Sequence, residues 1–249
     1  MAASTSKPQE AVNMYEDYSS GRHLSETVEA FLRRLPPLST SIMDYGPWIY
    51  CASPYASKGN GPEDQATLVR RGRQLLKKFT ALKAGIEASM PGKSKGVITR
   101  QLDVDWTGHT TPQAIRTRPS RPRARNRLHV RQMDAIPLPP DLNTAWSLVA
   151  HGTVAGELGH AAKVATDDGS QNARLICIYT PDFGDKEDVK RVLERILAMG
   201  LCNRNGAIGE GKAIYYKADA YTYLELMGGN EFGLKTSLFS NREVLAEGK

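Results

Sequence analysis

The sequence is poor in cysteine and has no long apolar run. Its 249 residues hold three cysteines, Cys51, Cys177 and Cys202, which lie far apart and form no CxxC pair. Scattered thiols are typical of a reducing compartment, and Cys177, inside an apolar run, is expected to be a buried thiol. The N-terminal residues lack the apolar segment of a secretory signal, and nothing approaches the roughly 18 consecutive apolar residues that a membrane span needs. We therefore expect a soluble protein of the cytoplasm.

Familiar signatures of chemistry are also absent. The sequence contains no GxxxxGK[ST], HExxH or GxSxG motif, and no GxGxxG follows a predicted strand. The five histidines show no ligand spacing, so we assign no metal, and nothing indicates a cofactor. Function must therefore be sought in the distribution of charge and in local groups of polar residues.

What the chain does have is one concentrated block of positive charge. The stretch RTRPSRPRARNRLHVR, residues 116–131, holds seven arginines and no carboxylate, and without them the formal net charge of +6 would fall by seven to −1. Arginine binds phosphate through paired hydrogen bonds, and Pro119 and Pro122 favour an extended chain that can follow a nucleic-acid backbone. RNA is favoured over duplex DNA, because no helix-turn-helix or zinc-finger pattern is present; the alternative is a solvated loop. The predicted tRNA contacts are Arg116, Arg118, Arg121, Arg123, Arg125, Arg127 and Arg131.

The hydrophobic pattern predicts an α+β fold in which helices back an antiparallel sheet. Residues 1–20 are expected to form a flexible tail, and residues 21–249 a single domain with an irregular Arg-rich segment at about 91–140. The predicted helices cover 25–35, capped by Ser25, then 64–90, 141–155 and 185–199, capped by Asp185. The predicted strands cover 47–53, 159–166 and 173–180, and lie within KAIYYKA, YTYLELM and FGLKTSLFS.

The predicted helix over 64–90 has an apolar stripe and an opposite cationic face. That face is either solvated or a second basic surface beside the arginine block. It is predicted to consist of Arg70, Arg71, Arg73, Lys77, Lys78 and Lys83.

Three short groups of polar residues are candidates for chemistry. In YTPDFGD, Asp182 and Tyr179 are candidates for a site, since Asp185 is explained as a helix cap. In YYKADAYTYLEL, Tyr215, Lys217 and Asp219 would share one face of a strand, as a site or as a Lys–Asp pair on a half-buried sheet.

The third group is LDVDW. Asp103, Asp105 and Trp106 could clasp a guanidinium or an amine. The alternative is an acidic loop that folds back on the nearby arginines.

Longer stretches of the C-terminal half resemble one known family. They read AWSLVAHGTVAGELGHAAKVAT, RLICIYTPDFGDKEDVKRVLERILAMGL and AIYYKADAYTYLEL…GNEFGLKTSLFSNREVL. They are similar to the basophilic-leukaemia-expressed protein family, a domain of unknown function, over roughly residues 141–245, with weaker similarity in PWIYCASP and RRGRQLLKKF. The resemblance implies the fold of the mRNA cap-binding translation initiation factor 4E, a curved antiparallel sheet with helices on its convex face.

Fungal relatives in this family include arginine-containing cyclodipeptide synthases. These take aminoacyl groups from two charged tRNAs, one of them arginyl, and release a cyclic dipeptide. RLHVRQ stands here where many members have a GKW motif, and Phe232 stands where many have Trp after NE. Both changes weaken an aromatic sandwich for a cap, and the first adds positive charge. The resemblance therefore implies a tRNA-dependent transferase of secondary metabolism, without cofactor, membrane or DNA.

On this hypothesis the carboxylates and the cations have separate roles. Asp103, Asp105 or Asp182 would bind the guanidinium of the arginyl group. The group that handles proton transfer or the carbonyl oxygen would be Asp219 with Lys217 and Tyr223.

Two other functions stay open. A non-catalytic module of the same fold would bind RNA or an mRNA cap, with Trp48 and Trp106 stacking on bases. An interaction protein would instead use the basic loop to meet an acidic partner.

Overall fold

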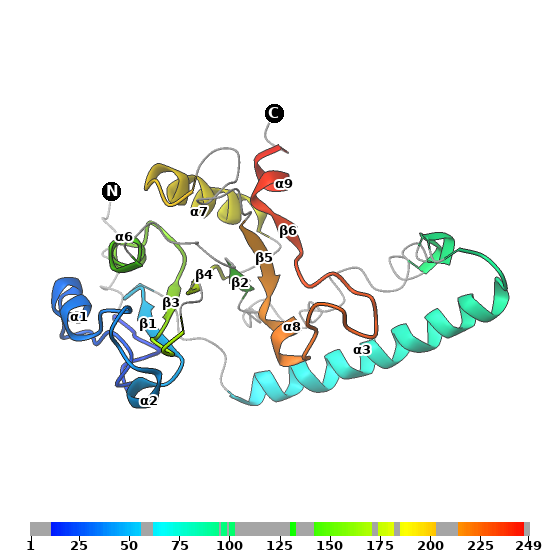
Figure 1. Cartoon of the computed structure of the whole chain (residues 1–249), viewed down its shortest axis with the longest axis horizontal. Coiled ribbons are helices and arrows are strands. Elements are labelled where there is room, and N and C mark those ends of the chain that lie inside the picture. The colour runs from blue at the N-terminus through cyan, green and yellow to red at the C-terminus, as the bar shows by residue number, and fades with distance from the viewer. Residues whose placement is uncertain are drawn as a thin grey trace, which may run out of the picture. The chain divides into compact units, whose positions relative to one another are not determined.

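The computed structural model describes residues 11–55, 62–94, 96–98, 100–102, 130–132, 142–170, 174–181, 185–202 and 214–246. They belong to two compact units, whose elements are labelled in Figure 1. Unit 1 comprises residues 1–59, 129–218 and 237–249, and unit 2 comprises residues 60–128 and 219–236. Each unit has an apolar cluster of its own.

Unit 1 is built on two three-stranded antiparallel sheets. The first has the order β1-β3-β4, with β1 at Trp48–Ala52, β3 at Ala161–Ala165 and β4 at Ile176–Tyr179. The second has the order β2-β5-β6, with β2 at Val130–Gln132, β5 at Tyr215–Ala218 and β6 at Phe239–Ser240. Strand β2 lies beside β4, so the two sheets adjoin there. The coarse prediction, an α+β fold with antiparallel strands, is confirmed.

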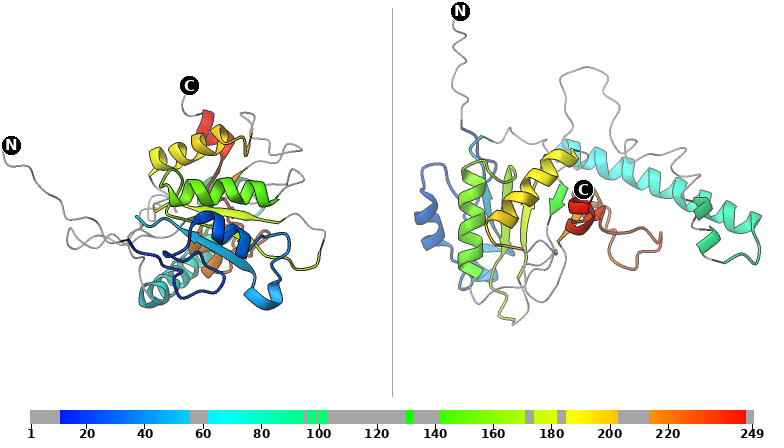
Figure 2. Two further views of the ribbon diagram at one scale, coloured as in Figure 1. Left: turned by 90° about the vertical axis from the view of Figure 1, so that its left-hand side faces the viewer. Right: turned by 90° about the horizontal axis from the view of Figure 1, so that it is seen from above.

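Helices cover one face of these sheets, which we call the helix face. They are α1 (Val28–Arg34), α6 (Leu142–Val154) and α7 (Lys186–Ala198), which lie one above another in the left view of Figure 2. Ile49, Val164 and Ile178 point to this side and share an apolar core with the fully buried Trp146 of α6. Two short helices, α2 (Ile42–Tyr45) and α9 (Asn241–Ala246), complete the described part of unit 1. The opposite face of the sheets is called the distal face below.

Side-chain caps set where the helices begin. The hydroxyl of Thr27 accepts a hydrogen bond from the backbone N–H three residues on, at 3.2 Å, so the predicted cap at Ser25 is wrong by two residues. The prediction for α7 is confirmed, because a carboxylate oxygen of Asp185 accepts from the backbone N–H of Asp188 at 3.1 Å. This cap also explains Asp185 without a catalytic role.

Part of the predicted flexible tail makes defined contacts. The ring of Tyr15 stacks on that of Tyr50 of β1, with centroids 4.6 Å apart. The Arg34 guanidinium of α1 donates to the carbonyl oxygen of Ser19 at 2.8 Å. Residues 11–20 are therefore part of unit 1, and the rest of the predicted tail lies outside the described residues.

Unit 2 contains α3 (Pro62–Ser89), helical residues 96–98 and 100–102, and α8 (Asp219–Tyr223). The apolar stripe predicted for α3 is confirmed at Phe79 and Ile86, which form a cluster with Leu102. No helix in the described ranges is long and apolar enough to cross a membrane.

Two close contacts shape unit 2. Gly72 of α3 lies so near Leu224 that a methyl group at this position would collide with the leucine side chain. The amide of Asn230 donates to the carbonyl oxygens of Met227 and Leu234, at 2.9 and 2.8 Å, and accepts from the backbone N–H of Leu234. These bonds hold the chain after α8 in a compact turn.

One predicted strand is therefore wrong and another is wrong in part. YTYLELM forms the end of α8 and a turn rather than a strand, because local hydrogen bonds replace those of a ladder. Of FGLKTSLFS only the last two residues are a strand, β6. The sequence analysis also missed β2, which is three residues long, and α9, although Ser240 and Glu243 have the spacing of a capping box.

Candidate functional site on the distal face

The register of the first sheet determines which side chains share the distal face. Tyr50 lies opposite Lys163, Lys163 lies opposite Cys177, and directly opposed residues project to the same side. Small residues therefore form the floor of this face, aromatic residues stand around it, and one lysine lies at its centre. The full set is Trp48, Tyr50, Ala52, Ala161, Lys163, Ala165, Cys177 and Tyr179.

Lys163 is buried among aromatic rings. Its side chain belongs to the middle of β3, and the residue is 4% exposed. The ammonium nitrogen Nζ lies 3.7 Å from the centroid of the Trp48 ring and 6.0 Å from that of Tyr179. Burying an ion costs several kcal/mol, and a desolvated cation–π contact returns about 2 kcal/mol of that. Because lysine is rarely kept in such a place for packing alone, Lys163 is a functional candidate.

Sequence reasoning missed this residue. The signal is a single lysine in the middle of the predicted strand GHAAKVAT, where a charge must lie on one of the two faces of the sheet. The register with β1 then supplies the aromatic contacts, and register is not visible in the sequence of one strand.

Tyr179, predicted to bind substrate, ends β4 beside Lys163 on the distal face. It is 8% exposed. Its carbonyl oxygen accepts from the backbone N–H of His160 at 2.9 Å, and a methyl group at Gly159 would collide with that carbonyl. A residue without a side chain at 159 is thus needed for β4 to end where it does.

Trp48, the stacking residue of the cap-binding alternative, already has a cation on one ring face. The ammonium of Lys163 occupies the position where a base would stack on that face. A second cationic group there would meet charge repulsion, so this face of Trp48 does not suit a positively charged cap.

In the second sheet, β5 carries another of the predicted residues. Tyr216 packs with Val189 of α7 on the helix face, so its neighbours Tyr215 and Lys217 project to the distal side. The register of β2 and β5 sets Arg131 opposite Lys217. The last arginine of the basic block thus lies at the same ladder position as a predicted catalytic residue.

Asp219 and Tyr223 do not share a strand with Lys217. They are the first and last residues of α8, in unit 2, while Lys217 belongs to unit 1. The predicted common face of Tyr215, Lys217 and Asp219 is therefore wrong beyond Lys217, because the strand ends at Ala218. Asp219 is 7% exposed and Tyr223 is 37% exposed.

The remaining predictions lie outside the described residues. They concern Asp103, Asp105, Trp106, Asp182, Arg116, Arg118, Arg121, Arg123, Arg125 and Arg127.

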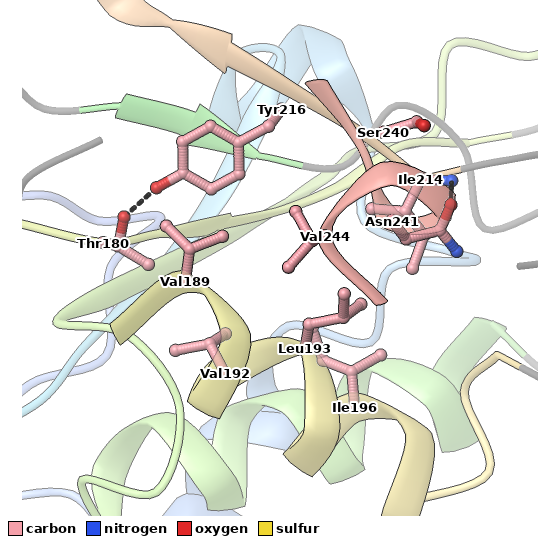
Figure 3. Close-up of a pocket in the computed structure, with 10 residues that line it drawn as sticks. All are labelled: Thr180, Val189, Val192, Leu193, Ile196, Ile214, Tyr216, Ser240, Asn241 and Val244. Atoms are coloured by element: carbon pink, nitrogen blue, oxygen red, sulfur yellow. Dashed lines mark hydrogen bonds between the residues drawn. The ribbon is translucent and has the colours of Figure 1, made fainter. Parts of the chain in front are cut away.

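On the helix face, the ends of β4 and β5 border a small pocket (Figure 3). Its walls include Val192 and Leu193 of α7 and Val244 of α9, and the hydroxyls of Thr180 and Tyr216 hydrogen-bond to one another across it. The cavity volume of about 20 Å³ suffices for a single water molecule and not for an amino acid. This pocket is therefore a packing defect with a polar edge rather than a substrate site.

The cationic face of α3 is partly as predicted. Between residues 66 and 86 the helix has no acidic residue, and five of the six predicted cations are exposed. None of these five forms an ion pair within the parts of the chain that are described. Lys83 is the exception and a correction, since it is half-buried and its Nζ donates to the carbonyl oxygen of Glu231 at 3.5 Å. The exposed five are Arg70, Arg71, Arg73, Lys77 and Lys78.

The thiols do not suit nucleophilic chemistry. All three cysteines are free and buried, as predicted for Cys177. Burial raises the pKa of Cys51 to about 12 and that of Cys202 to about 11, so both are neutral at physiological pH. Over the described ranges, no three His, Cys, Asp or Glu side chains gather so as to hold a metal ion.

The sequence also matches the model of a known protein family. The model of a protein family described as basophilic leukemia-expressed protein Bles03 matches residues 1–225. The match includes the N-terminal half, where the resemblance in sequence was weaker, and ends before β6.

Proposed function

The chain belongs to the basophilic leukemia-expressed protein Bles03 family, and on that premise we propose that it makes an arginine-containing cyclic dipeptide from two aminoacyl-tRNAs. The observation that carries the proposal is the pairing of Arg131 with Lys217 in adjoining strands. It joins a block of phosphate-binding residues to a lysine on the distal face, where Lys163 and Tyr179 also lie. A tRNA-dependent transferase needs this combination of a polyanion surface and polar groups beside it. We also propose that the two sheets form the curved arrangement of initiation factor 4E.

The proposed reaction needs few catalytic groups from the protein. An aminoacyl ester is already activated, so the α-amine of one residue can attack the carbonyl carbon of the other once both are held together. The carbon–oxygen bond to the ribose breaks, and the ribose hydroxyl takes up a proton. The second amine then attacks the remaining ester in the same way, which closes the ring and releases the second tRNA.

The residues divide into three roles in this proposal. The arginine block and the exposed cations of α3 bind the tRNA backbone. Asp103, Asp105 or Asp182 binds the guanidinium of the arginyl group. Asp219, with Lys217 and Tyr223, transfers protons or contacts the carbonyl oxygen.

Mass spectrometry of product is the direct test. Bacteria that express the full chain should release cyclic Arg–Xaa dipeptides that are absent with an empty vector. Purified protein with arginyl-tRNA and a mixed pool of aminoacyl-tRNAs should form the same compounds, and deacylated tRNA, the matched control, should yield none. Folded protein that makes no product and is retained on immobilised cap analogue would instead favour the binding module.

A further inference from the structure

The exposed cations of α3 lie in two rows along the helix. We propose that these rows bind the two phosphate strands of a paired RNA stem, with α3 lying across the shallow minor groove of that stem. The inference rests on the proposed function for the identity of the RNA as tRNA, and it names the part of the tRNA that α3 contacts.

The spacing of the cations within α3 produces the two rows. At 3.6 residues per turn, successive residues are about 100° apart around the helix axis. Arg70, Arg73 and Lys77, which we call the first row, therefore lie on one side of the exposed surface. Arg71 and Lys78, the second row, lie roughly 100–120° further round the axis. Because α3 is one continuous helix (Figure 1), the spacing between the rows is fixed.

An uncharged strip separates the rows. Gln74 and Ala81 are both exposed, and the helical period places them midway between the two rows. Ala81 is small, so a duplex can approach the helix closely at this point. The side-chain amide of Gln74 has a donor and an acceptor for the 2′-hydroxyls that line the minor groove of RNA. The strip thus suits a shallow and polar groove.

A paired stem presents phosphates on both sides of such a groove. The minor groove of A-form RNA is wide and shallow, whereas its major groove is too deep and narrow for side chains to read. A helix with its side chains is about 10–12 Å across. Long cationic side chains on both flanks of α3 therefore extend toward separate strands, while a single row would meet only one of them.

The rows carry an energetic cost that a polyanion would offset. Arg73 is three residues from Arg70 and four from Lys77, and like charges at these spacings destabilise a helix. No acidic residue of α3 between residues 66 and 86 relieves this repulsion, and no ion pair within the described parts of the chain does so either. Phosphates bound along both rows would remove it.

The same surface lacks the groups that two other anionic partners need. Single-stranded nucleic acid is bound by aromatic side chains that stack on bases, and the one aromatic residue of α3, Phe79, is buried. A membrane surface needs apolar side chains on the docking face. Phe79 and Ile86 instead pack with Leu102, and no large apolar side chain between residues 66 and 89 is exposed. A paired stem is therefore the partner that fits.

The first test neutralises one row at a time in the full chain. Arg70→Gln with Lys77→Gln changes the first row, and Arg71→Gln with Lys78→Gln removes the same charge from the second. Fluorescence anisotropy measures binding to a labelled RNA hairpin, to an RNA strand of equal length that does not pair, and to a DNA hairpin of the same sequence. The arginine block is unchanged in these proteins, so its contribution cancels in each comparison with the wild type.

Both row variants should lose affinity mainly for the RNA hairpin. We expect each to bind the hairpin roughly 10- to 30-fold more weakly at about 0.15 M salt, since each loses two phosphate contacts. The losses for the unpaired strand and the DNA hairpin should stay within about threefold. Equal losses for all three probes, or a loss with only one of the two rows, would overturn the inference.

A charge-preserving variant tests the arrangement of the rows. Arg71→Gln and Lys78→Gln are combined with Thr80→Lys and Ala88→Lys, which are exposed positions near the side of the first row. The net charge is then unchanged, but the second row is lost. This protein should bind the RNA hairpin as weakly as the variant that lacks the second row, with unchanged helix content by circular dichroism. Binding as tight as that of the wild type would show that total charge is enough and would overturn the two-row contact.

The outcomes also separate this inference from the proposed function. Hairpin binding that depends on both rows, in a protein that forms no cyclic dipeptide, would sink the synthase and leave the RNA contact standing. Product formation that is unaffected when both rows are neutralised would leave the synthase and sink the contact. Row variants that lose binding to phosphatidylserine vesicles but not to the RNA hairpin would make α3 a membrane surface, which also overturns the inference.

Discussion

The ammonium nitrogen of Lys163 lies 3.7 Å above the centre of the Trp48 ring, on neighbouring strands of one sheet. The contact is diagonal, since Lys163 is directly opposite Tyr50 and Trp48 is two residues further along β1. It couples a buried charge to an aromatic face, so the stability of the fold should depend on both residues together.

A double-mutant cycle at this pair should give a coupling energy of about 1–2 kcal/mol. Trp48→Leu leaves the ammonium buried without its ring, so it should destabilise the wild type more than it destabilises Lys163→Met. Denaturant unfolding of the four proteins measures this difference. A coupling energy near zero would mean that the Trp48 ring stabilises the fold only by burying apolar area and not through a cation–π interaction with Lys163.

The hydrogen bond between Thr180 and Tyr216 should contribute through the cost of leaving one hydroxyl buried without the other. Each of Thr180→Val and Tyr216→Phe is expected to lower the free energy of unfolding by about 1–3 kcal/mol. The double variant should lose less than the sum, because both partners are then apolar. Product formation should change little, and a large loss of activity in a stable Tyr216→Phe protein would contradict the interpretation of this region as structural.

Gly159→Ala should disturb the end of β4. A methyl group at this position would collide with the carbonyl of Tyr179, which is backbone and cannot rotate away. We expect a destabilisation of about 2–4 kcal/mol by thermal or denaturant unfolding. Gly169→Ala makes the matched control for steric conflict, since nothing lies within 4 Å of its added methyl, although its positive φ of 76° adds some backbone strain. Equal losses in the two variants would show that the contact at Tyr179 is not what matters.

The ion pair of Arg34 with Glu26 should make stability depend on pH at the acid end. Hydrogen bonds from Arg34 hold the pKa of Glu26 below its usual 4.5, and the nearest N···O distance is 2.7 Å. Because the folded pKa is depressed, this stabilisation is present above the usual pKa and is lost as the pH falls through the folded value.

Glu26→Gln tests this pH dependence. It should cost about 1–2 kcal/mol at neutral pH and much less once the pH falls below the depressed pKa of the folded protein, where the wild-type carboxyl is also neutral. Urea unfolding at several pH values measures the difference between the two proteins. A loss that does not vary with pH would contradict an ionic origin.

Prediction from sequence succeeded where the residues of one helix or strand alone determine its type and its bounds. The stripe of α7 and its cap at Asp185 follow from spacing within 15 residues, and both are confirmed. The strands β1, β3 and β4 were also found, because each lies in a short and mostly apolar run, and those of β1 and β4 are rich in β-branched and aromatic residues.

Prediction of structure from the sequence failed where contacts between distant parts of the chain determine the local conformation. The chain after α8 lies against α3, where Gly72 closely approaches Leu224, and this contact joins segments far apart in sequence. The aromatic surroundings of Lys163 need the registers of three strands, none of which the hydrophobic pattern reports. Tyr179 was found because it ends a recognisable strand, whereas Lys163 lies in the middle of one.

The exposed cations of α3 should contribute to RNA affinity through salt-dependent contacts. Arg71→Gln, Lys77→Gln and Lys78→Gln together remove three charges that have no ion-pair partner within the described residues. If all three neutralise phosphates, the slope of log Kobs against log salt should become shallower by about two to three, since each contact contributes roughly 0.7–0.9.

A charge-matched control decides whether this effect belongs to α3. Arg33→Gln, Lys186→Gln and Lys190→Gln remove the same charge from α1 and α7, so they should leave the slope unchanged if binding is local to α3. Lys83→Gln, on the buried side of α3, should likewise have no effect on the slope. Fluorescence anisotropy with labelled tRNA at several salt concentrations measures all of these proteins. Equal slopes for the two triple variants would mean that RNA responds to net charge alone, and the role of α3 in tRNA binding would have to be abandoned.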